Sequence, residues 1–312
     1  MLFWFWERKL NKSITGVVHT AFAVLPAGSL ALSGLLALSS VSFQARAVAI
    51  TTSAIASDDV TGVIDSDAKS NPPASLLSEA VDPDTFFGAD PAVARAAMNE
   101  SGVGSVAVSG IWADGSSSKT TLSAVATWSD TYTNTSSAAQ SVRYDFSIDP
   151  ADLRIFDFAG VSDASPDAMR ASYSVNILHN GSSVFSSDAT LIGGGNGHVL
   201  ERNGTDFGST FVSNPFFTVI GYTFDAYVGS LDLGILAVGE SLDIGYEIRA
   251  EVTSPGFETG AAASIGDPNN LSGSGLAGAI VANVPTGTVS VPGSLWLIGG
   301  LLGMVSVRRN KG

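Results

Sequence analysis

Apolar and polar side chains alternate residue by residue over several stretches of this chain. A period of two gives an extended strand one buried and one solvent-exposed face, whereas an α-helix would scatter the same residues around its axis. The clearest stretch runs from Leu242 to Val252, where every even-numbered residue is apolar and every odd-numbered residue is glycine or charged. The same alternation covers 122–128, 142–148 and 171–177, and further strand candidates are 103–112, 152–158, 183–192, 216–228 and 276–284.

Turn-forming dipeptides separate these stretches. Asn180-Gly181 is the strongest, because Asn and Gly tolerate the positive φ angles of a type I′ turn and so predict a tight hairpin. The others are Asp114-Gly115, Asp149-Pro150, Asn203-Gly204 and Pro255-Gly256. The Gly-rich residues 193–197 and the Ser/Thr-rich residues 115–137 are expected to be loops or edge surface. Many short strands without a long helical period predict an all-β fold over 103–284, an antiparallel β-sandwich of the jelly-roll or immunoglobulin-like kind.

Residues 48–102 are expected to form an acidic linker before that domain. Aspartates at 58, 59, 65 and 67 lie among small residues, and prolines at 72, 73 and 83 interrupt the chain. Only Pro91 to Met98 predicts a short helix, because proline suits the first turn and alanine favours helix. Asp65-x-Asp67 resembles the start of a calcium loop, but Lys69 puts a cation where a third ligand would lie.

Residues 1–47 have the layout of a secretory signal peptide. Basic residues at 8, 9 and 12 precede an uncharged stretch that is most apolar from Ala21 to Leu38. The small-x-small pattern of Ala45 and Ala47 predicts cleavage after Ala47, with Ala49 as an alternative site. An uncleaved membrane anchor is the other interpretation, because the apolar stretch exceeds the roughly 7–15 residues of a signal core. Both interpretations export the residues that follow, since the basic cluster stays in the cytoplasm.

Residues 285–312 are expected to form a second membrane segment. Val289 to Val307 carries no charge, and as a helix it would reach about 28 Å, close to the thickness of the bilayer's hydrocarbon core. Pro292 marks the expected start of this transmembrane helix. Arg308, Arg309 and Lys311 follow it as a basic tail that stays in the cytoplasm.

The order of a proline, a Gly/Leu-rich apolar helix and a terminal arginine cluster resembles the PEP-CTERM sorting signal, in its variant that begins Val-Pro-Leu-Pro. Ser290 stands where that variant has a proline. The resemblance implies a Gram-negative bacterium in which an exosortase processes the tail, while signal peptidase acts at the other end. It also implies a final location at the cell surface or in an exopolysaccharide matrix. The residues that carry the resemblance are Val291, Pro292, Gly293, Trp296, Gly299, Gly303, Arg308 and Arg309.

Composition excludes several classes of protein. The chain has no cysteine, which removes disulfides, thiol nucleophiles, Cys-ligated metals and the lipid attachment of a lipoprotein. Its 29 acidic and 15 basic residues give a net charge of −14, and seven of the basic residues lie in the two terminal segments. The exported part is therefore strongly acidic, and we expect no nucleic-acid partner.

Few residues offer catalytic chemistry. His179 and His198 are the histidines that follow residue 47; His179 is expected in the hairpin turn and His198 at the end of the glycine-rich loop. No GxSxG nucleophile motif is present. Gly273 to Gly278 matches GxGxxG, but no helix pattern and no acidic residue of a dinucleotide site follow it. The sequence therefore predicts no catalytic residue, no cofactor and no metal site.

Aromatic residues raise one alternative. Trp128 shares the phase of Leu122 and is expected in the core, whereas Tyr132 in the Ser/Thr-rich segment is the candidate for stacking on a glycan; Tyr222 and Tyr227 are further exposed candidates. The leading hypothesis is a non-enzymatic exported protein, anchored in the inner membrane facing the periplasm until processing and then part of the cell envelope or exopolysaccharide matrix. The alternatives are a cell-surface carbohydrate-binding module and, third, a secreted hydrolase.

Overall fold

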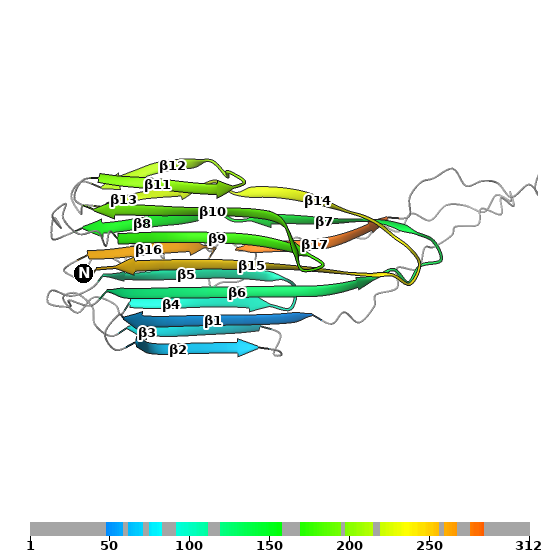
Figure 1. The fold of residues 1–312 in the computed structure, drawn as a ribbon, viewed down its shortest axis with the longest axis horizontal. Coiled ribbons are helices and arrows are strands. Elements are labelled where there is room, and N and C mark those ends of the chain that lie inside the picture. The colour runs from blue at the N-terminus through cyan, green and yellow to red at the C-terminus, as the bar shows by residue number, and fades with distance from the viewer. Residues whose placement is uncertain are drawn as a thin grey trace, which may run out of the picture. The chain divides into compact units, whose positions relative to one another are not determined.

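The computed structural model describes residues 48–58, 62–70, 75–82, 92–111, 119–157, 169–194, 197–214, 219–255, 259–266 and 275–283. These residues contain no α-helix and form 17 strands in two antiparallel sheets, an arrangement consistent with a β-sandwich (Figure 1). The seven-stranded sheet has the order β11 (Gly197–Gly204), β10 (Ser182–Gly194), β9 (Met169–His179), β15 (Ser241–Ser254), β6 (Thr120–Thr133), β1 (Ala49–Asp58), β2 (Gly62–Ser70). The ten-stranded sheet has the order β12 (Ser209–Asn214), β13 (Val219–Phe224), β8 (Ala151–Asp157), β16 (Thr259–Ile265), β5 (Val103–Ile111), β17 (Leu276–Asn283), β7 (Gln140–Ile148), β14 (Tyr227–Leu236), with β4 (Ala92–Asn99) also paired to β5 and β3 (Ser75–Asp82) paired to β4.

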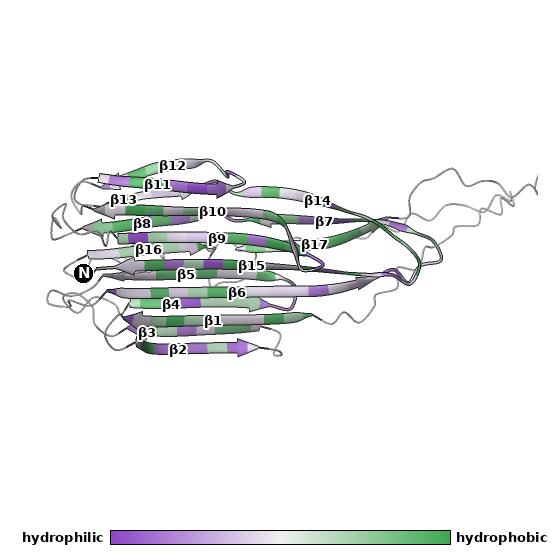
Figure 2. Cartoon of the chain, viewed as in Figure 1, coloured by the Kyte–Doolittle hydropathy of each residue, from purple (hydrophilic) through white to green (hydrophobic). Residues whose placement is uncertain are grey.

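The strongest sequence alternations are confirmed as strands with one buried face. In β15 every even-numbered residue from 242 to 252 is buried, whereas Asp243, Glu247 and Arg249 are exposed. Strands β6, β7 and β9 show the same pattern, and Trp128 is 5% exposed, as predicted. Apolar and polar bands accordingly alternate along β15 and its neighbours in Figure 2. The buried sides of both sheets form one shared core.

The predicted β-hairpin is also confirmed. Asn180 and Gly181 have φ angles of 49° and 77°, the left-handed values of a type I′ turn. His179 pairs with Ser182 across this turn, which joins β9 to β10. The Asn180 side chain adds a tertiary contact, since its Oδ1 accepts a hydrogen bond of 2.8 Å from the backbone N of Asp243.

The expected linker over 48–102 is wrong, because four strands lie there. β1 occupies the interior of the seven-stranded sheet between β6 and β2, and β3 and β4 extend the ten-stranded sheet. The helix expected over Pro91 to Met98 is wrong as well, since 92–99 is strand β4. Ala92, Ala94, Ala96 and Met98 are buried on one face of β4, so burial in the sandwich overrides the helix propensity of alanine. The first described strand of the β domain therefore begins at Ala49, well before residue 103.

Two further expectations need correction. The Ser/Thr-rich residues 115–137 include β6, which lies between β15 and β1 in the interior of a sheet and is neither loop nor edge. His198 does not close a flexible loop, because it belongs to β11 and pairs with Gly193 of β10. In β6, Thr and Ser occupy most of the outward positions, so composition alone hid the period of two. In β11, His198 takes a half-buried position between the exposed residues Gly197 and Val199.

Three rows of the ten-stranded sheet each consist of two consecutive strands that continue one another. All three rows are interrupted at the same position along the sheet. β7 is followed by β8 across residues 149–150, and β13 is followed by β14 across 225–226, with the pairing register unchanged through both interruptions. β16 and β17 pair with β8 and β7 on the other side and are separated by residues 266–275. Pro150 has no N–H to complete the ladder in the interior of a sheet, so hydrogen bonding stops there. The single strand expected over 216–228 is therefore two strands.

A series of aromatic rings fills the core. The Trp128 ring lies 5.7 Å from Tyr246 and 6.3 Å from Tyr144, measured between ring centroids. Tyr246 Oη donates a hydrogen bond of 3.0 Å to the carbonyl of Gly102, whereas Tyr144 Oη finds no partner among the described residues. The series continues, with centroid separations of 4.9–6.3 Å, through Phe146, Phe185, Tyr227, Phe207, Tyr173 and Phe224.

Stability is expected to fall as the pH rises above about 10. Burial raises the pKa of Tyr144 and Tyr246 above the usual value of 10 and that of Tyr173 to about 12. The unfolded chain can release these protons from about pH 10 while the folded chain holds them, so each tyrosine removes up to about 1.4 kcal/mol per pH unit between its two pKa values. Urea midpoints from pH 8 to 11.5 measure the loss. Tyr144→Phe should make the slope shallower, and a parent midpoint that does not change above pH 10 would contradict the prediction.

Candidate functional site

Some residues predicted to have a function lie outside the described residues. These are the signal-cleavage residues Ala45 and Ala47 and all eight residues of the sorting signal. Val48, the first residue after the predicted cleavage, is described and packs partly buried against the core.

Tyr132 is not the exposed stacking residue that its surroundings in the sequence predict. It lies in β6, half-buried against the core, and its Oη donates a hydrogen bond of 2.5 Å to Gln140 Oε1. Tyr227 is similarly occupied, because its ring packs 5.0 Å from Phe207 and 5.4 Å from Phe185. Of the three candidate tyrosines, only Tyr222 lies near an exposed ring.

Tyr222 belongs to a cluster that we call the aromatic edge, formed with His198 and Phe211. The imidazole of His198 stacks on the Phe211 ring at 5.1 Å with an interplanar angle of 11°, and the Tyr222 ring lies 5.3 Å from Phe211. His198 Nε2 is 3.2 Å from Tyr222 Oη, within hydrogen-bond distance. Phe211 is 47% exposed, so much of its ring faces solvent.

The topology explains why these three side chains meet. β11 is the last strand of the seven-stranded sheet, and β12 and β13 are the last two strands of the ten-stranded sheet. Phe211 pairs with Tyr222 in register, which places both side chains on one face of their sheet. Phe224, two residues along on that face, is buried in the core, so the face is the one turned toward the other sheet. The aromatic edge therefore closes the sandwich on this side.

The aromatic edge combines an accessible ring with two polar groups. A flat ring face suits the apolar C–H face of a pyranose, and an imidazole nitrogen and a phenolic hydroxyl can exchange hydrogen bonds with sugar hydroxyls. Arg202 lies further along β11, with its guanidinium 5.5 Å from the Phe224 ring centroid and bonded to both carboxylate oxygens of Asp206 at 2.8 and 2.9 Å. The positive charge next to the edge is thus neutralised by Asp206, so the surface suits a neutral ligand better than an anion.

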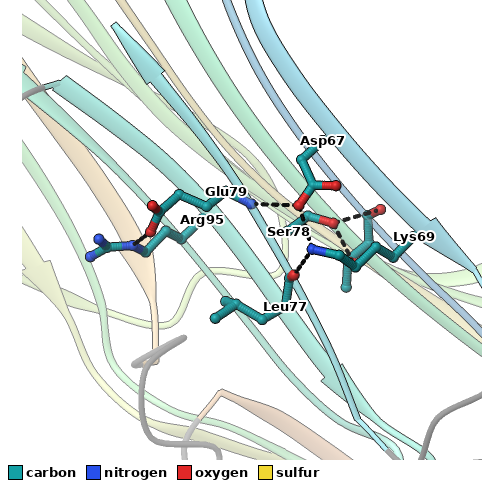
Figure 3. A network of polar contacts seen from close by, with 7 residues as sticks. Asp67, Lys69, Leu77, Ser78, Glu79 and Arg95 are labelled. Atoms are coloured by element: carbon teal, nitrogen blue, oxygen red, sulfur yellow. Dashed lines mark hydrogen bonds and ion pairs between the residues drawn. The ribbon is translucent and has the colours of Figure 1, made fainter. Parts of the chain in front are cut away.

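The acidic residues of β2, at the end of the seven-stranded sheet away from β11, have a structural role. Figure 3 shows the contacts of Asp67 and Lys69. Asp67 accepts hydrogen bonds from Lys69 and from the backbone N of Glu79, and Lys69 donates to the carbonyl of Leu77. Asp65 accepts a hydrogen bond of 2.9 Å from the backbone N of Val81. These side chains form hydrogen bonds with backbone N–H and C=O groups on the edge of β3 that does not pair with β4. The contacts protect that edge from pairing with another chain. The Lys69 ammonium beside Asp67 lowers the pKa of that carboxyl.

Other candidate groups are also engaged in structural contacts. Asp149 Oδ2 accepts a hydrogen bond of 2.8 Å from the backbone N of Gly275, and Asp152 pairs with Arg154 at 2.6 Å. Ser78 and Thr52 form a buried hydroxyl pair at 2.8 Å between β3 and β1, which links the two sheets. Within the part of the chain that the structure describes, no group of three or more His, Asp or Glu side chains is placed to hold a metal ion.

The sequence predicts only part of the aromatic edge. The sequence predicts Tyr222 as a candidate, but Phe211 lies in the six-residue strand β12, which no apolar–polar alternation indicates. His198 stands alone in the sequence, because its partners are separated from it by 13 and 24 residues. The sequence signal lies in 209–213, where Ser209, Phe211 and Ser213 share one face of a strand and Phe211 is the single large residue on that face.

No protein-family model and no curated protein matches this sequence. Among solved structures, that of the infectious bursal disease virus Gx strain aligns with 90% of this chain and 69% of its own at 12% identity, with a TM-score of 0.10. A TM-score this low carries no argument about fold or function. None of the described residues belongs to a helix with the length and hydropathy to cross a membrane.

Proposed function

We propose that the chain is the precursor of a non-enzymatic exported protein of the cell envelope or exopolysaccharide matrix. In this proposal signal peptidase removes residues 1–47, the C-terminal helix holds the protein in the inner membrane facing the periplasm, and an exosortase then releases it. The proposal rests on the two terminal sequence patterns and on the resemblance of the tail to a PEP-CTERM signal. The double-sheet body is proposed to be an enlarged sandwich of the jelly-roll or immunoglobulin-like kind.

The bounds of the first and last described strands, β1 and β17, support the proposal most directly, because neither expected cut falls within a described strand. β1 begins at Ala49, two residues after Ala47, and β17 ends at Asn283, nine residues before Pro292. Both cuts would leave all described strands whole. The pairing of Ala49 with Ser129 favours cleavage after Ala47 over cleavage after Ala49, which would remove the first residue of β1.

Intact-mass measurement of the protein in the envelope fraction tests this proposal. We expect a dominant form that begins at Val48 and ends near Pro292. Arg308→Gln combined with Arg309→Gln should leave the tail attached, whereas Arg249→Gln, which changes an exposed arginine of the folded domain, should be processed normally. A dominant form that still contains Trp296 and Arg309 in the parent protein would overturn the proposal.

Carbohydrate binding is the second candidate function, and the aromatic edge is the observation that favours it. Its exposed ring and two adjacent hydrogen-bonding groups are the combination that a neutral pyranose unit requires. In this candidate function the partner is the exopolysaccharide, and the stacking residue is Phe211 in place of Tyr132.

Phe211→Ala is expected to weaken binding to the exopolysaccharide of the producing cells at least about fivefold. Loss of one ring contact removes about 1 kcal/mol of binding free energy, and the half-exposed position keeps the effect on folding small. Val199→Ala is the matched control, because Val199 is a 59% exposed apolar residue next to His198 on the other face of β11. Polysaccharide pull-down measures both variants. Unchanged binding of Phe211→Ala, or equal loss in both, would contradict the prediction.

A further inference from the structure

Both ends of the β domain leave the sandwich at the same pole. Ala49, the first residue of β1, pairs with Ser129 near the end of β6. Asn283, the last residue of β17, pairs with Ser141 near the start of β7. Because residues 134–139 join β6 directly to β7, the two chain ends lie beside this connection, on the right in Figure 1. We call this end, with the loop 134–139 and the turn 237–240, the exit pole.

Asn134 makes the exit pole rigid. Its Nδ2 donates hydrogen bonds of 2.9 Å to the carbonyls of Leu236 and Ala138, and its Oδ1 accepts from the N and Oγ of Ser136. Its backbone N and O bond to Glu240 and Gly239 at 2.9 and 2.8 Å. The fully buried Asn134 thus ties the β6–β7 loop to the β14–β15 turn, and the pole keeps its shape without help from the terminal segments.

The surface chemistry of the exit pole differs from that of the rest of the domain. Residues 134–140 and 235–239 contain no charged residue, although the chain has a net charge of −14. Ile235 and Val238 are exposed there at 70% and 56%. Glu240 is the one acid of the turn 237–240, and its carboxylate accepts a hydrogen bond from the backbone N of Ala237. An anionic lipid surface repels an acidic body, so a pole with a single acid and two exposed apolar side chains can approach headgroups at low cost.

The length of chain after β17 limits how far this pole can lie from a membrane anchor. Nine residues separate Asn283 from Pro292, the expected start of the helix, and they span at most about 30 Å when extended. The opposite pole, where Thr120 begins β6, lies about 45 Å away along the 14 residues of that strand.

We propose that the exit pole is a membrane-facing surface, whose partner in the anchored precursor is the lipid headgroup layer. This inference rests on the proposed function, because it needs the C-terminal anchor. It assigns an orientation to the precursor: the loop 134–139 and the turn 237–240 lie against the bilayer, and the opposite pole points into the periplasm. The aromatic edge runs along one side and stays accessible to polysaccharide before release.

The absence of cysteine gives a clean test of the orientation. Val238→Cys at the exit pole and Val63→Cys at the opposite pole are matched, because both replace valines that are 56% and 62% exposed. Val63 lies at the start of β2 and pairs with Ser57 near the end of β1, at the end of the sheet where β6 begins. Each full-length variant is labelled with a donor dye and reconstituted into phosphatidylethanolamine–phosphatidylglycerol vesicles that carry an acceptor on their headgroups.

Energy transfer to the lipid is expected to be several-fold stronger from position 238 than from position 63. Flotation of the same vesicles shows separately whether the chain is anchored. Labelled chains that float but transfer equally from both positions, or more strongly from position 63, would overturn the orientation and leave the anchor intact. Labelled chains that fail to float would overturn the anchor of the proposed function, and the orientation with it.

Discussion

Ile248→Asp is expected to leave the protein unfolded in water at 25 °C. Ile248 is fully buried at the centre of β15, where it pairs with Ala126 of β6 on one side and Val175 of β9 on the other. None of the described buried residues is Lys, Arg or His, so a carboxylate at this position has no cation to pair with in that part of the core. Burying it, or expelling the central strand of the seven-stranded sheet, costs about 5 kcal/mol or more, which is comparable to the whole stability of many domains.

Glu247→Lys is the matched control for this prediction. Glu247 is the neighbouring residue of β15 and points to the exposed face, so reversing its charge should change the free energy of unfolding by less than about 0.5 kcal/mol. Urea denaturation followed by circular dichroism and tryptophan fluorescence measures both variants. An Ile248→Asp protein as stable as the parent would mean that the register of β15, and with it the core described here, is wrong.

The sequence predicts the strands whose two faces differ most. β15 and β7 were predicted because each places a row of large apolar side chains opposite a row of charged ones, and that contrast is a local property. The β9–β10 hairpin was predicted because Asn180-Gly181 fixes the turn by backbone geometry alone. These elements need no knowledge of the partner strand.

The elements that were missed depend on distant partners. β4 is rich in alanine, which favours helix in isolation, and it becomes a strand because β3 and β5 pair with it and the core covers its inner face. The break between β13 and β14 is opposite Pro150, a residue more than 70 positions earlier in the chain. Neither fact is visible in the segment concerned.

The same limit applies to the candidate site. Tyr132 was expected to be exposed because its neighbours are Ser and Thr, but those neighbours occupy the outward positions of an interior strand and Tyr132 packs against the core. The aromatic edge exists because the last strands of two different sheets meet. His198 and Phe211 come together only after β11 and β12 have taken the final positions in their sheets.

The match of residues 273–278 to GxGxxG is explained by strand packing and does not require a cofactor. A β-strand, β17, follows Gly275 where a dinucleotide site would have a helix. Gly275 has a φ of 105°, and its backbone N and O pair with Asp149 at the interruption of the ten-stranded sheet. A Cβ atom built on Gly275 would lie 1.9 Å from the carbonyl oxygen of Gly104, which is backbone and cannot rotate away. Glycine is therefore needed here for close approach of β17 to β5.

Gly275→Ala is accordingly expected to lower the free energy of unfolding by at least about 3 kcal/mol. The alanine would be strained in the left-handed backbone conformation, and its Cβ would clash with Gly104 unless β17 separated from β5. Gly181→Ala is the matched control: its φ of 77° is also left-handed, but no atom lies within 4 Å of the added Cβ, so strain alone should cost about 1 kcal/mol. Urea midpoints at constant m-value compare the two variants. Equal losses would mean that the contact between Gly275 and Gly104 is not as close as described, and that the positive φ angle alone selects glycine at position 275.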